Sequence, residues 1–498
     1  MTTRVFKGGA WTLAGQLGPV AVSLVTTPLV IRMLHAEGYG VLVLVGLIPG
    51  YLSFADLGMG LASTKFAAEA FARSDHEREA RIVRTAALIS LLTSVPIAVV
   101  IFVSAGWLAS QLNVPAGLYQ ESVLALRASA FAFVLNFLNN ILNTPQLTRL
   151  RMDLNALVTG GVRIAGLIAT PIVVYLGGGI LGAVLVLLAV SVFTFLGHVV
   201  VSRRLLPELM SREVDSTAGR MLLRFGMAIA FGGIAGILLT NIEKLALARL
   251  ASVATLGYYS VAFTFATMIT MASQAMVQAL IPGFSQLTGP GSRSQLQSLF
   301  SRAMRLNVLL VLPLLATLFV FARPVLNLWV GPDFALQSSL PLYALIVGLI
   351  FNTAALVPAS LLYSAGRADR LAKLYWAELV PYIALIAILT SLFGAVGAAS
   401  AWSIRVTVDA IVIALLSREH IGEPLRSLTA VLVALVVLSG WCAAATVIGL
   451  PLVPAMVIHA GLMAGYLVLA WKKVLDTDER NWVKASIQQR SYRTIHAE

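Results

Sequence analysis

Charged residues are scarce in this sequence. They make up 11% of its 498 residues, whereas hydrophobic residues make up 59%. Soluble globular proteins carry about 25% charged residues, because a surface that faces water must be solvated. A chain with less than half that share cannot cover a water-facing surface of this size. The composition therefore excludes a soluble globular protein and predicts an all-α polytopic membrane protein.

Cysteine is almost absent, since Cys442 is the only one in the chain. A single thiol forms no intramolecular disulfide and no metal cluster by itself. The sequence also lacks a Gly-rich phosphate-binding loop, a His-Glu-x-x-His motif and a soluble segment large enough for an ATPase. We therefore expect no catalysis and no cofactor. Energy for any transport would come from an ion gradient, a substrate gradient or downstream consumption of the product.

The net charge of +13 does not indicate nucleic-acid binding, because the basic residues form short blocks between apolar runs. A helix needs about 20 apolar residues to cross the hydrocarbon. By that length the sequence predicts fourteen spans. They cover residues 10–33, 39–61, 84–107, 119–142, 155–176, 179–201, 222–243, 254–281, 303–323, 341–363, 374–392, 394–416, 427–449 and 451–471. Turns join the closest pairs at Gly177-Gly178-Gly179, Phe393-Gly394 and Gly449-Leu450-Pro451.

The basic residues alternate between the two sides of these spans. With the N-terminus inside, 28 of the 35 basic residues lie in inner loops and tails, and four lie at the outer side. Cytoplasmic loops collect Lys and Arg, and one miscounted span would invert every later loop. The pattern therefore predicts that both termini are cytoplasmic.

Two short motif pairs recur at similar separations. Gly38-Tyr39, at the start of the second span, is echoed by Gly257-Tyr258, at the start of the eighth. The run 179–183 is echoed by 394–398, so the separations are 219 and 215 residues. A repeat of six spans fits both pairs. Because six is even, we expect two lobes related by a pseudo-twofold axis along the membrane normal, with a cavity between them.

The repeat divides the chain into five parts. We predict an N-terminal six-helix lobe at 1–202, a cytoplasmic linker at 203–221, a C-terminal six-helix lobe at 222–418, helices 13 and 14 at 419–472, and a cytoplasmic tail at 473–498.

Charged residues inside the spans are the first candidates for a functional site. A charge near the bilayer centre costs about 2.5–3.5 kcal/mol on insertion scales, so it usually faces a cavity or a partner. The candidates are Arg127, Arg163, Arg405, Asp56 and Arg32. No acidic residue lies one helical turn from Arg127 or Arg163, which favours a cavity-lining role for these two.

The other three charges have structural interpretations that stay open. Arg405 and Asp409 are spaced to pair on one helix face. Arg32 lies close enough to the interface to extend its guanidinium into it. Asp56 can cap a helix or pair with Lys65.

Polar uncharged side chains form a second set of candidates. Four asparagines form a polar stripe on the fourth span: Asn136, Asn139, Asn140 and Asn143. Asn136, Asn140 and Asn143 share one helix face, and Gln274 and Gln278 lie in the eighth span. Amides at this spacing suit sugar hydroxyls, and hydrogen bonding between helices is the alternative. Guanidinium groups match phosphate oxygens in a bidentate geometry. The arginines therefore suggest an anionic cargo, and both roles of the amides stay open.

Several segments resemble a known family. The run 27–34, followed by Gly38-Tyr39-Gly40 and by 51–60, resembles the opening of the polysaccharide biosynthesis (O-antigen flippase) family. Gly257-Tyr258-Tyr259-Ser260 and the stretch around Gly366-Arg367 fit the second half of its pattern. This family belongs to the multidrug/oligosaccharidyl-lipid/polysaccharide exporter superfamily.

The resemblance implies a two-lobed transporter of the bacterial inner (plasma) membrane that works by alternating access. Its cargo would be a polyprenyl-diphosphate-linked oligosaccharide, flipped from the cytoplasmic to the outer leaflet for cell-surface polysaccharide such as lipopolysaccharide O-antigen. The expected partners are this lipid-linked substrate, membrane lipids and a glycan polymerase or glycosyltransferases, with no nucleic acid.

Three other functions stay open at this point. A flippase for lipid II, the peptidoglycan precursor, shares the fourteen spans and a cationic cavity. A cation-coupled multidrug exporter would carry acidic groups in its cavity, whereas the unneutralised groups here are basic. A membrane glycosyltransferase or polymerase would need catalytic acids and a sizeable outer loop, and the outer loops here are short.

Overall fold

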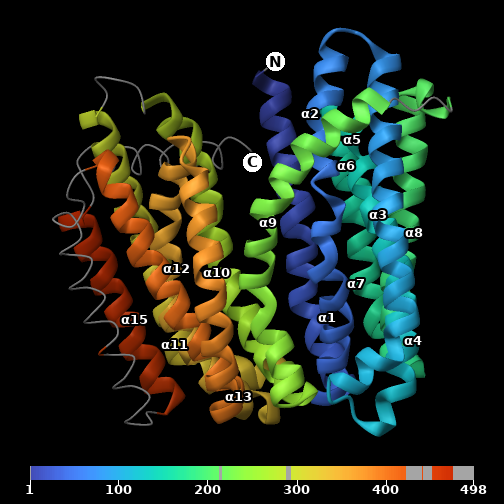
Figure 1. The fold of residues 1–498 in the computed structure, drawn as a ribbon. Coiled ribbons are helices and arrows are strands. Elements are labelled where there is room, and N and C mark those ends of the chain that lie inside the picture. The colour runs from blue at the N-terminus through green and yellow to red at the C-terminus, as the bar shows by residue number, and fades with distance from the viewer. Residues whose placement is uncertain are drawn as a thin grey trace, which may run out of the picture. The chain divides into compact units, whose positions relative to one another are not determined.

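The computed structural model describes residues 2–211, 216–287, 293–421 and 451–474, together with residues 440 and 480. Every element in these ranges is helical (Figure 1). Nine helical segments among the described residues are long and apolar enough to cross a membrane. The prediction of an all-α, multi-pass membrane protein is therefore confirmed. The predicted span 427–449 and most of the predicted tail 473–498, as well as Cys442, lie outside the described residues.

The first part of the chain contains short helical turns between its long helices. Its elements are α1 (Thr2–Tyr51), η1 (Leu52–Asp56), α2 (Met59–Ala72), α3 (His76–Gln111), η2 (Ala116–Leu118), α4 (Tyr119–Leu142), α5 (Thr144–Thr148), α6 (Met152–Asn155), η3 (Ala156–Gly161), α7 (Val162–Val173), η4 (Val174–Gly178), α8 (Gly179–Leu205) and η5 (Pro207–Met210). The later elements are α9 (Ser216–Leu250), α10 (Val253–Leu287), α11 (Arg293–Val330), α12 (Pro332–Ser364), α13 (Ala368–Ile421), α15 (Leu452–Leu469) and η7 (Ala470–Val474).

Several helical runs are too long for one crossing. The 50 residues of α1 would extend about 75 Å at 1.5 Å per residue, against a hydrocarbon core of about 30 Å. The helical backbone conformation is interrupted where the chain must reverse direction, at His35 (φ 56°) in α1 and at Gly394 (φ 54°) in α13. Gly177 (φ 90°) and Gly179 (φ 55°) separate α7 from α8. The glycine breaks coincide with two turns predicted from the sequence.

The helices group into two compact units. Unit 1 comprises Met1–Val261, Trp329–Phe334 and Tyr375–Ala401, and unit 2 comprises Ala262–Leu328, Ala335–Leu374 and Trp402–Glu498. In unit 1, α4 packs against α3 and α8, and α7 packs against α8 and α1 (Figure 1). The predicted lobe boundaries at residues 202 and 222 stay predictions.

The outward faces of these helices are apolar. Val103 in α3 is 75% exposed, and Tyr175 in η4 is 81% exposed. In water such side chains would favour aggregation, whereas in a bilayer they meet lipid tails. The scarcity of charge in the sequence therefore has its counterpart in these lipid-facing surfaces.

Hydrogen bonds between helices stabilise the interior of unit 2. The buried Asn307 of α11 accepts a hydrogen bond from the Ser273 hydroxyl of α10, at 2.5 Å. Its amide nitrogen donates to the carbonyl of Thr353 in α12, at 2.8 Å. One side chain thus connects three helices, a common arrangement where no hydrophobic effect drives helices together.

The start of α8 depends on both glycine and a distant carboxylate. Glu121 of α4 accepts a hydrogen bond from the backbone N–H of Leu181, in the first turn of α8, at 2.9 Å. A Cβ atom on Gly179 would lie 2.3 Å from the same carboxylate oxygen. The negative charge of Glu121 is also stabilised by the positive, N-terminal end of the α8 dipole. The glycine motif predicted to open this span therefore has a local physical reason.

Two glycines from the recurring motifs meet inside unit 1. A Cβ atom on Gly40 of α1 would lie 1.7 Å from the carbonyl oxygen of Val253, at the start of α10. A Cβ atom on Gly257 would lie 2.6 Å from the carbonyl oxygen of Ala36. Only residues without a side chain let these backbones approach so closely.

A buried ion pair holds α3 against the segment after α4. Arg149 contacts both carboxylate oxygens of the fully buried Glu79, at 2.5 and 3.1 Å. The Thr148 hydroxyl donates to Glu79 at 3.1 Å, and the guanidinium lies 4.6 Å from the centre of the Phe71 ring. Because the carboxylate is satisfied on several sides, its burial is tolerated.

We expect Gly40→Ala to disrupt the contact between α1 and α10. Overpacking typically costs about 1–3 kcal/mol, and here the obstacle is backbone that cannot rotate away. The measurement is the thermal midpoint and the monodisperse yield of protein purified in mild detergent. Gly50→Ala on the same helix is the control, because a Cβ there meets nothing within 4 Å. Equal midpoints for the two variants would contradict the close approach.

We expect Arg149→Leu to lower the thermal midpoint in detergent by several degrees. Removing one partner of a buried ion pair costs about 3–5 kcal/mol, because the other charge stays buried. Arg151→Leu is the matched control, since Arg151 pairs with Asp153 at the surface, where both side chains are 38–47% exposed. Surface pairs contribute about 0–1 kcal/mol. If the control loses as much stability as Arg149→Leu, burial does not set the strength of the pair.

Candidate functional site

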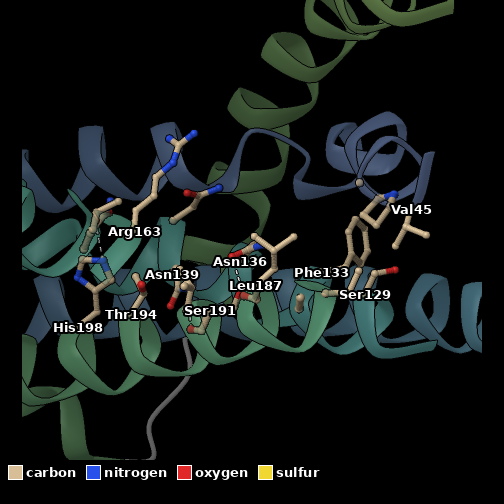
Figure 2. Close-up of a pocket in the computed structure, with 18 residues that line it drawn as sticks. Val45, Ser129, Phe133, Asn136, Asn139, Arg163, Leu187, Ser191, Thr194 and His198 are labelled. Atoms are coloured by element: carbon tan, nitrogen blue, oxygen red, sulfur yellow. Dashed lines mark hydrogen bonds between the residues drawn. The ribbon is translucent and has the colours of Figure 1, made fainter. Parts of the chain in front are cut away.

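A cavity of about 450 Å³ lies within unit 1, between α1, α4, α7 and α8 (Figure 2). Polar side chains from three of these helices and from η3 line it, although all four helices are predicted to lie in the membrane. Its polar lining residues are Ser129, Asn136, Asn139, Asn140, Asn143, Thr159, Arg163, Ser191, Thr194 and His198. Such a concentration of polar groups at membrane depth is expected only where a cavity or a partner satisfies them.

The amides of α4 form one side of this cavity. Asn136, Asn139, Asn140 and Asn143 recur at helical spacing, so they lie on one face of α4 and its C-terminal cap. Sequence analysis named all four as a polar stripe and placed Asn136, Asn140 and Asn143, without Asn139, on one helix face. The four come together because α4 turns this face towards α8 rather than towards lipid.

Two of these amides are positioned by α8. The Ser191 hydroxyl donates to Asn136 Oδ1 at 3.1 Å, and Asn139 Nδ2 donates to the Ser191 carbonyl at 3.2 Å. The Oδ1 atoms of Asn139 and Asn143 are buried, with no hydrogen-bond partner among the described residues. A buried acceptor without a donor costs about 1–3 kcal/mol. These two oxygens can accept hydrogen bonds from hydroxyl groups of a ligand.

His198 of α8 forms one end of the polar row. Its Nδ1 lies 2.9 Å from Gln146 Nε2 and its Nε2 lies 3.3 Å from the Thr159 hydroxyl. Ser191, Thr194 and His198 share one face of α8, at spacings of three and four residues. Sequence analysis did not select them. Their spacing, which places three polar residues on one face of an apolar span, is the sequence pattern that could have identified them.

Among the described residues that line the cavity, Arg163 alone carries a formal charge. It follows the π-helical segment η3, in the second position of α7, and its side chain is exposed to the cavity. In Figure 2 its guanidinium stands away from the row formed by Asn139, Thr194 and His198. It has no hydrogen-bond or ion-pair partner among the described residues.

None of the eighteen lining residues that the structure describes is acidic. The field inside is therefore set by Arg163 and by neutral dipoles, which favours an anion over a cation. Within the described ranges, no group of three or more His, Cys, Asp or Glu residues could hold a metal ion.

Arg127, the other arginine expected in a cavity, lies elsewhere on α4. It is not among the residues that line the cavity. Its guanidinium carbon lies 5.2 Å from the centre of the Phe102 ring on α3, a cation–π distance. Phe102 is 39% exposed and packs edge-on against Phe131. The sequence predicted the same cavity-lining role for Arg127 and Arg163. In the structure Arg163 lines the cavity, whereas α4 is rotated so that Arg127 contacts Phe102 instead.

Asp56 and Arg32 also lie outside this cavity. Asp56 accepts hydrogen bonds from the backbone N–H of Gly60, in the first turn of α2, at 3.3 Å, and from the Ser90 hydroxyl, at 3.3 Å. It therefore caps α2, one of its two expected structural roles. Lys65 instead lies over the rings of Phe66 and Phe225.

Arg32 connects α1 to a segment that is distant in sequence. It donates to the Trp329 carbonyl at 3.2 Å, and the Trp329 indole donates to the Leu24 carbonyl at 2.6 Å. The remaining candidates belong to unit 2. Arg405 is half-buried and Asp409 is buried one turn away on α13, and Gln274 is exposed on α10. Gln278 lies in α10, and its side chain is outside the described part of the structure.

Known proteins resemble the chain in sequence over most of its length. A Shigella flexneri protein provisionally described as an O-antigen transporter is 21% identical over 416 residues, which cover 82% of this chain and 96% of that protein. The uncharacterized membrane protein EpsK of Bacillus subtilis is 22% identical over 370 residues, which cover 71% of this chain and 70% of EpsK.

Solved structures show the same fold. An inward-facing multidrug resistance MATE family transporter of the MOP superfamily superposes with a TM-score of 0.64 at 18% identity, over 82% of this chain and 94% of that one. The lipid II flippase MurJ, in an inward closed conformation, superposes with a TM-score of 0.64 at 13% identity, over 92% of this chain and 99% of that one.

The family that the sequence motifs indicated is also found by direct comparison. A model of the family described as "Polysaccharide biosynthesis protein" matches residues 5–288. Because this match covers more than half of the chain, the chain belongs to the polysaccharide biosynthesis protein family.

Proposed function

We propose that this protein flips a polyprenyl-diphosphate-linked oligosaccharide from the cytoplasmic to the outer leaflet, by alternating access and without catalysis. The observation that carries the proposal is the composition of the cavity in unit 1. A row of asparagines and one arginine line it, and no carboxylate of the described ranges does. Family membership and the relative described as an O-antigen transporter support the same cargo.

Each part of this cargo has a counterpart in the cavity or in the bilayer. A guanidinium binds phosphate oxygens in a bidentate geometry, which assigns the diphosphate to Arg163. The unpartnered amide oxygens of Asn139 and Asn143 suit sugar hydroxyls, as do the exposed amides of Asn136 and Asn140. The polyprenyl chain needs no cavity, because the hydrocarbon core solvates it.

The topology required for this function follows from the breaks in the long helices. Nine candidate spans become twelve when the three longest are divided at His35, at Gly177–Gly179 and at Gly394. The 35-residue α9 adds one span, and the predicted span 427–449 would supply the fourteenth. An even number places both termini on one side, and the basic residues favour the cytoplasm.

We also propose the two six-helix lobes, at residues 1–202 and 222–418, with a pseudo-twofold axis along the membrane normal. The contact between Gly40 and Gly257 supports this arrangement, because motifs related by a twofold axis meet where that axis passes between them. Glycosyltransferases that build the lipid-linked sugar, and a polymerase that consumes it, are the proposed partners.

Two related transporters differ from this proposal in cargo. A lipid II-type flippase would use the same lipid diphosphate, and the likeness to MurJ extends to the fold alone. An exporter of organic cations would need a carboxylate, and the described lining of the cavity in unit 1 contains none. The chemistry therefore favours a lipid-linked anion over a cationic drug.

We expect Arg163→Gln to reduce surface polysaccharide on the order of tenfold, because charged hydrogen bonds contribute about 1.5–3 kcal/mol. The measurement is glycan display in a deletion strain that expresses each variant at equal membrane levels. Arg127→Gln is the comparison, since Arg127 lies on Phe102 outside the cavity and should keep near-normal display. Normal display with Arg163→Gln would remove Arg163 from the transport site.

We expect deletion of the gene to trap a lipid-linked oligosaccharide in the cytoplasmic leaflet. In spheroplasts this glycan should be inaccessible to an added impermeant lectin until the membrane is opened with detergent. Trapped lipid II would assign the peptidoglycan precursor as the cargo instead. Normal surface glycans together with accumulation of a cationic dye would contradict the proposal and favour a drug exporter.

A further inference from the structure

Unit 2 contains a separate cavity, of about 310 Å³, formed by α11, α12 and α13. Its floor is buried and includes Phe300 and Met304, which are 3% and 8% exposed. Its rim consists of exposed apolar side chains, with Phe351 at 38%, Ile411 at 53% and Leu415 at 48%. A buried floor and an exposed rim make it a groove that opens at the surface of the described part of unit 2.

Small residues create the room in this groove. Ala354 and Ala355 on α12 and Ala410 and Ala414 on α13 line it. At 1.5 Å per residue, the stretch of α13 from Ala410 to Arg418 extends about 12 Å. The groove therefore extends along about two turns of α13, and its apolar lining matches part of a hydrocarbon chain in polarity.

One end of the groove is cationic. Of the twelve described residues that line it, Ser417 and Arg418 are the polar ones. The Ser417 hydroxyl is used within α13, where it donates to the Ala414 carbonyl at 2.8 Å. Arg418 lies at the end of the candidate span Ala368–Glu419. Gln297, near the start of α11, donates to the Ile421 carbonyl at 2.9 Å. The start of α11 and the end of α13 therefore lie side by side.

The charge of Arg418 is not neutralised by its neighbours. The adjacent carboxylate, Glu419, is bound by Arg370 at 2.7 Å. Asp369, in the first turn of α13, faces Lys373 at 3.9 Å. Arg418 is exposed and has no hydrogen-bond or ion-pair partner among the described residues. Arginine side chains often extend into the interface, but here the guanidinium also closes the end of an apolar groove.

We propose that this groove binds one anionic phospholipid of the surrounding bilayer. Its phosphate lies at Arg418, and one acyl chain lies along the groove between α11, α12 and α13. Guanidinium and phosphate form charge-assisted hydrogen bonds, and the alanine-lined groove excludes water from the chain. The site is separate from the transport cavity in unit 1 and does not depend on the proposed cargo.

The test is native mass spectrometry of the full-length protein in detergent, titrated with phosphatidylglycerol or with phosphatidylcholine of the same chain length. Wild-type protein should retain one phosphatidylglycerol in preference to phosphatidylcholine. Arg418→Gln should weaken phosphatidylglycerol binding about fivefold, as expected for one basic residue near an anionic lipid. Ala414→Phe should weaken both lipids, because its side chain fills the groove.

Arg367→Gln is the matched control, since Arg367 is exposed and does not line the groove. It should leave binding at the wild-type level. Equal retention of the two lipids by wild-type protein, or equal loss in Arg418→Gln and Arg367→Gln, would overturn the proposal. Displacement of phosphatidylglycerol by a tenfold lower concentration of polyprenyl phosphate would also overturn it, because the groove would then belong to the cargo lipid.

Discussion

The hydrocarbon core of the bilayer offers backbone amides no water, so each N–H and C=O group must be satisfied within the protein. This constraint explains why every described element is a helix. It also explains where the helices end. Where the chain reverses direction, backbone N–H groups are left without a helical partner. At the start of α8 the Glu121 carboxylate accepts a hydrogen bond from one of them, the N–H of Leu181. Glycine occupies the reversal because its backbone adopts positive φ and leaves room for that carboxylate.

The same constraint determines how helices recognise one another. Lipid tails are as apolar as leucine, so helix contacts rely on close approach and on hydrogen bonds. Gly40 and Gly257 provide the first, and Asn307 in unit 2 provides the second by connecting three helices. Asn139 in unit 1 can serve both helix packing and ligand binding. Its amide nitrogen donates to α8, and its amide oxygen stays available within the cavity.

Three arginines of unit 1 lie in different environments, and each environment lowers the cost of the charge in a different way. Arg149 is paired with a fully buried carboxylate, and Arg127 lies on an aromatic ring. Arg163 lines a cavity without a counter-charge among the described residues. An isolated guanidinium at membrane depth is costly, so it is retained where an anionic ligand or water can reach it. This contrast distinguishes a residue suited to binding cargo from residues that hold helices together.

Much of the architecture was determined by sequence alone, because it depends on local patterns. Apolar length predicted a multi-pass helical membrane protein, glycine predicted the breaks at 177–179 and 394, and the motifs predicted the family. The candidate site was only partly predictable. The spacing of Asn136, Asn140 and Asn143 showed a polar face, whereas Ser191, Thr194 and His198 are some fifty residues away and join it only when α8 packs on α4. Arg127 and Arg163 were equivalent in sequence, since neither has an acidic residue one turn away. Only the tertiary structure separated them, because the rotation of a helix about its axis is set by packing against its neighbours.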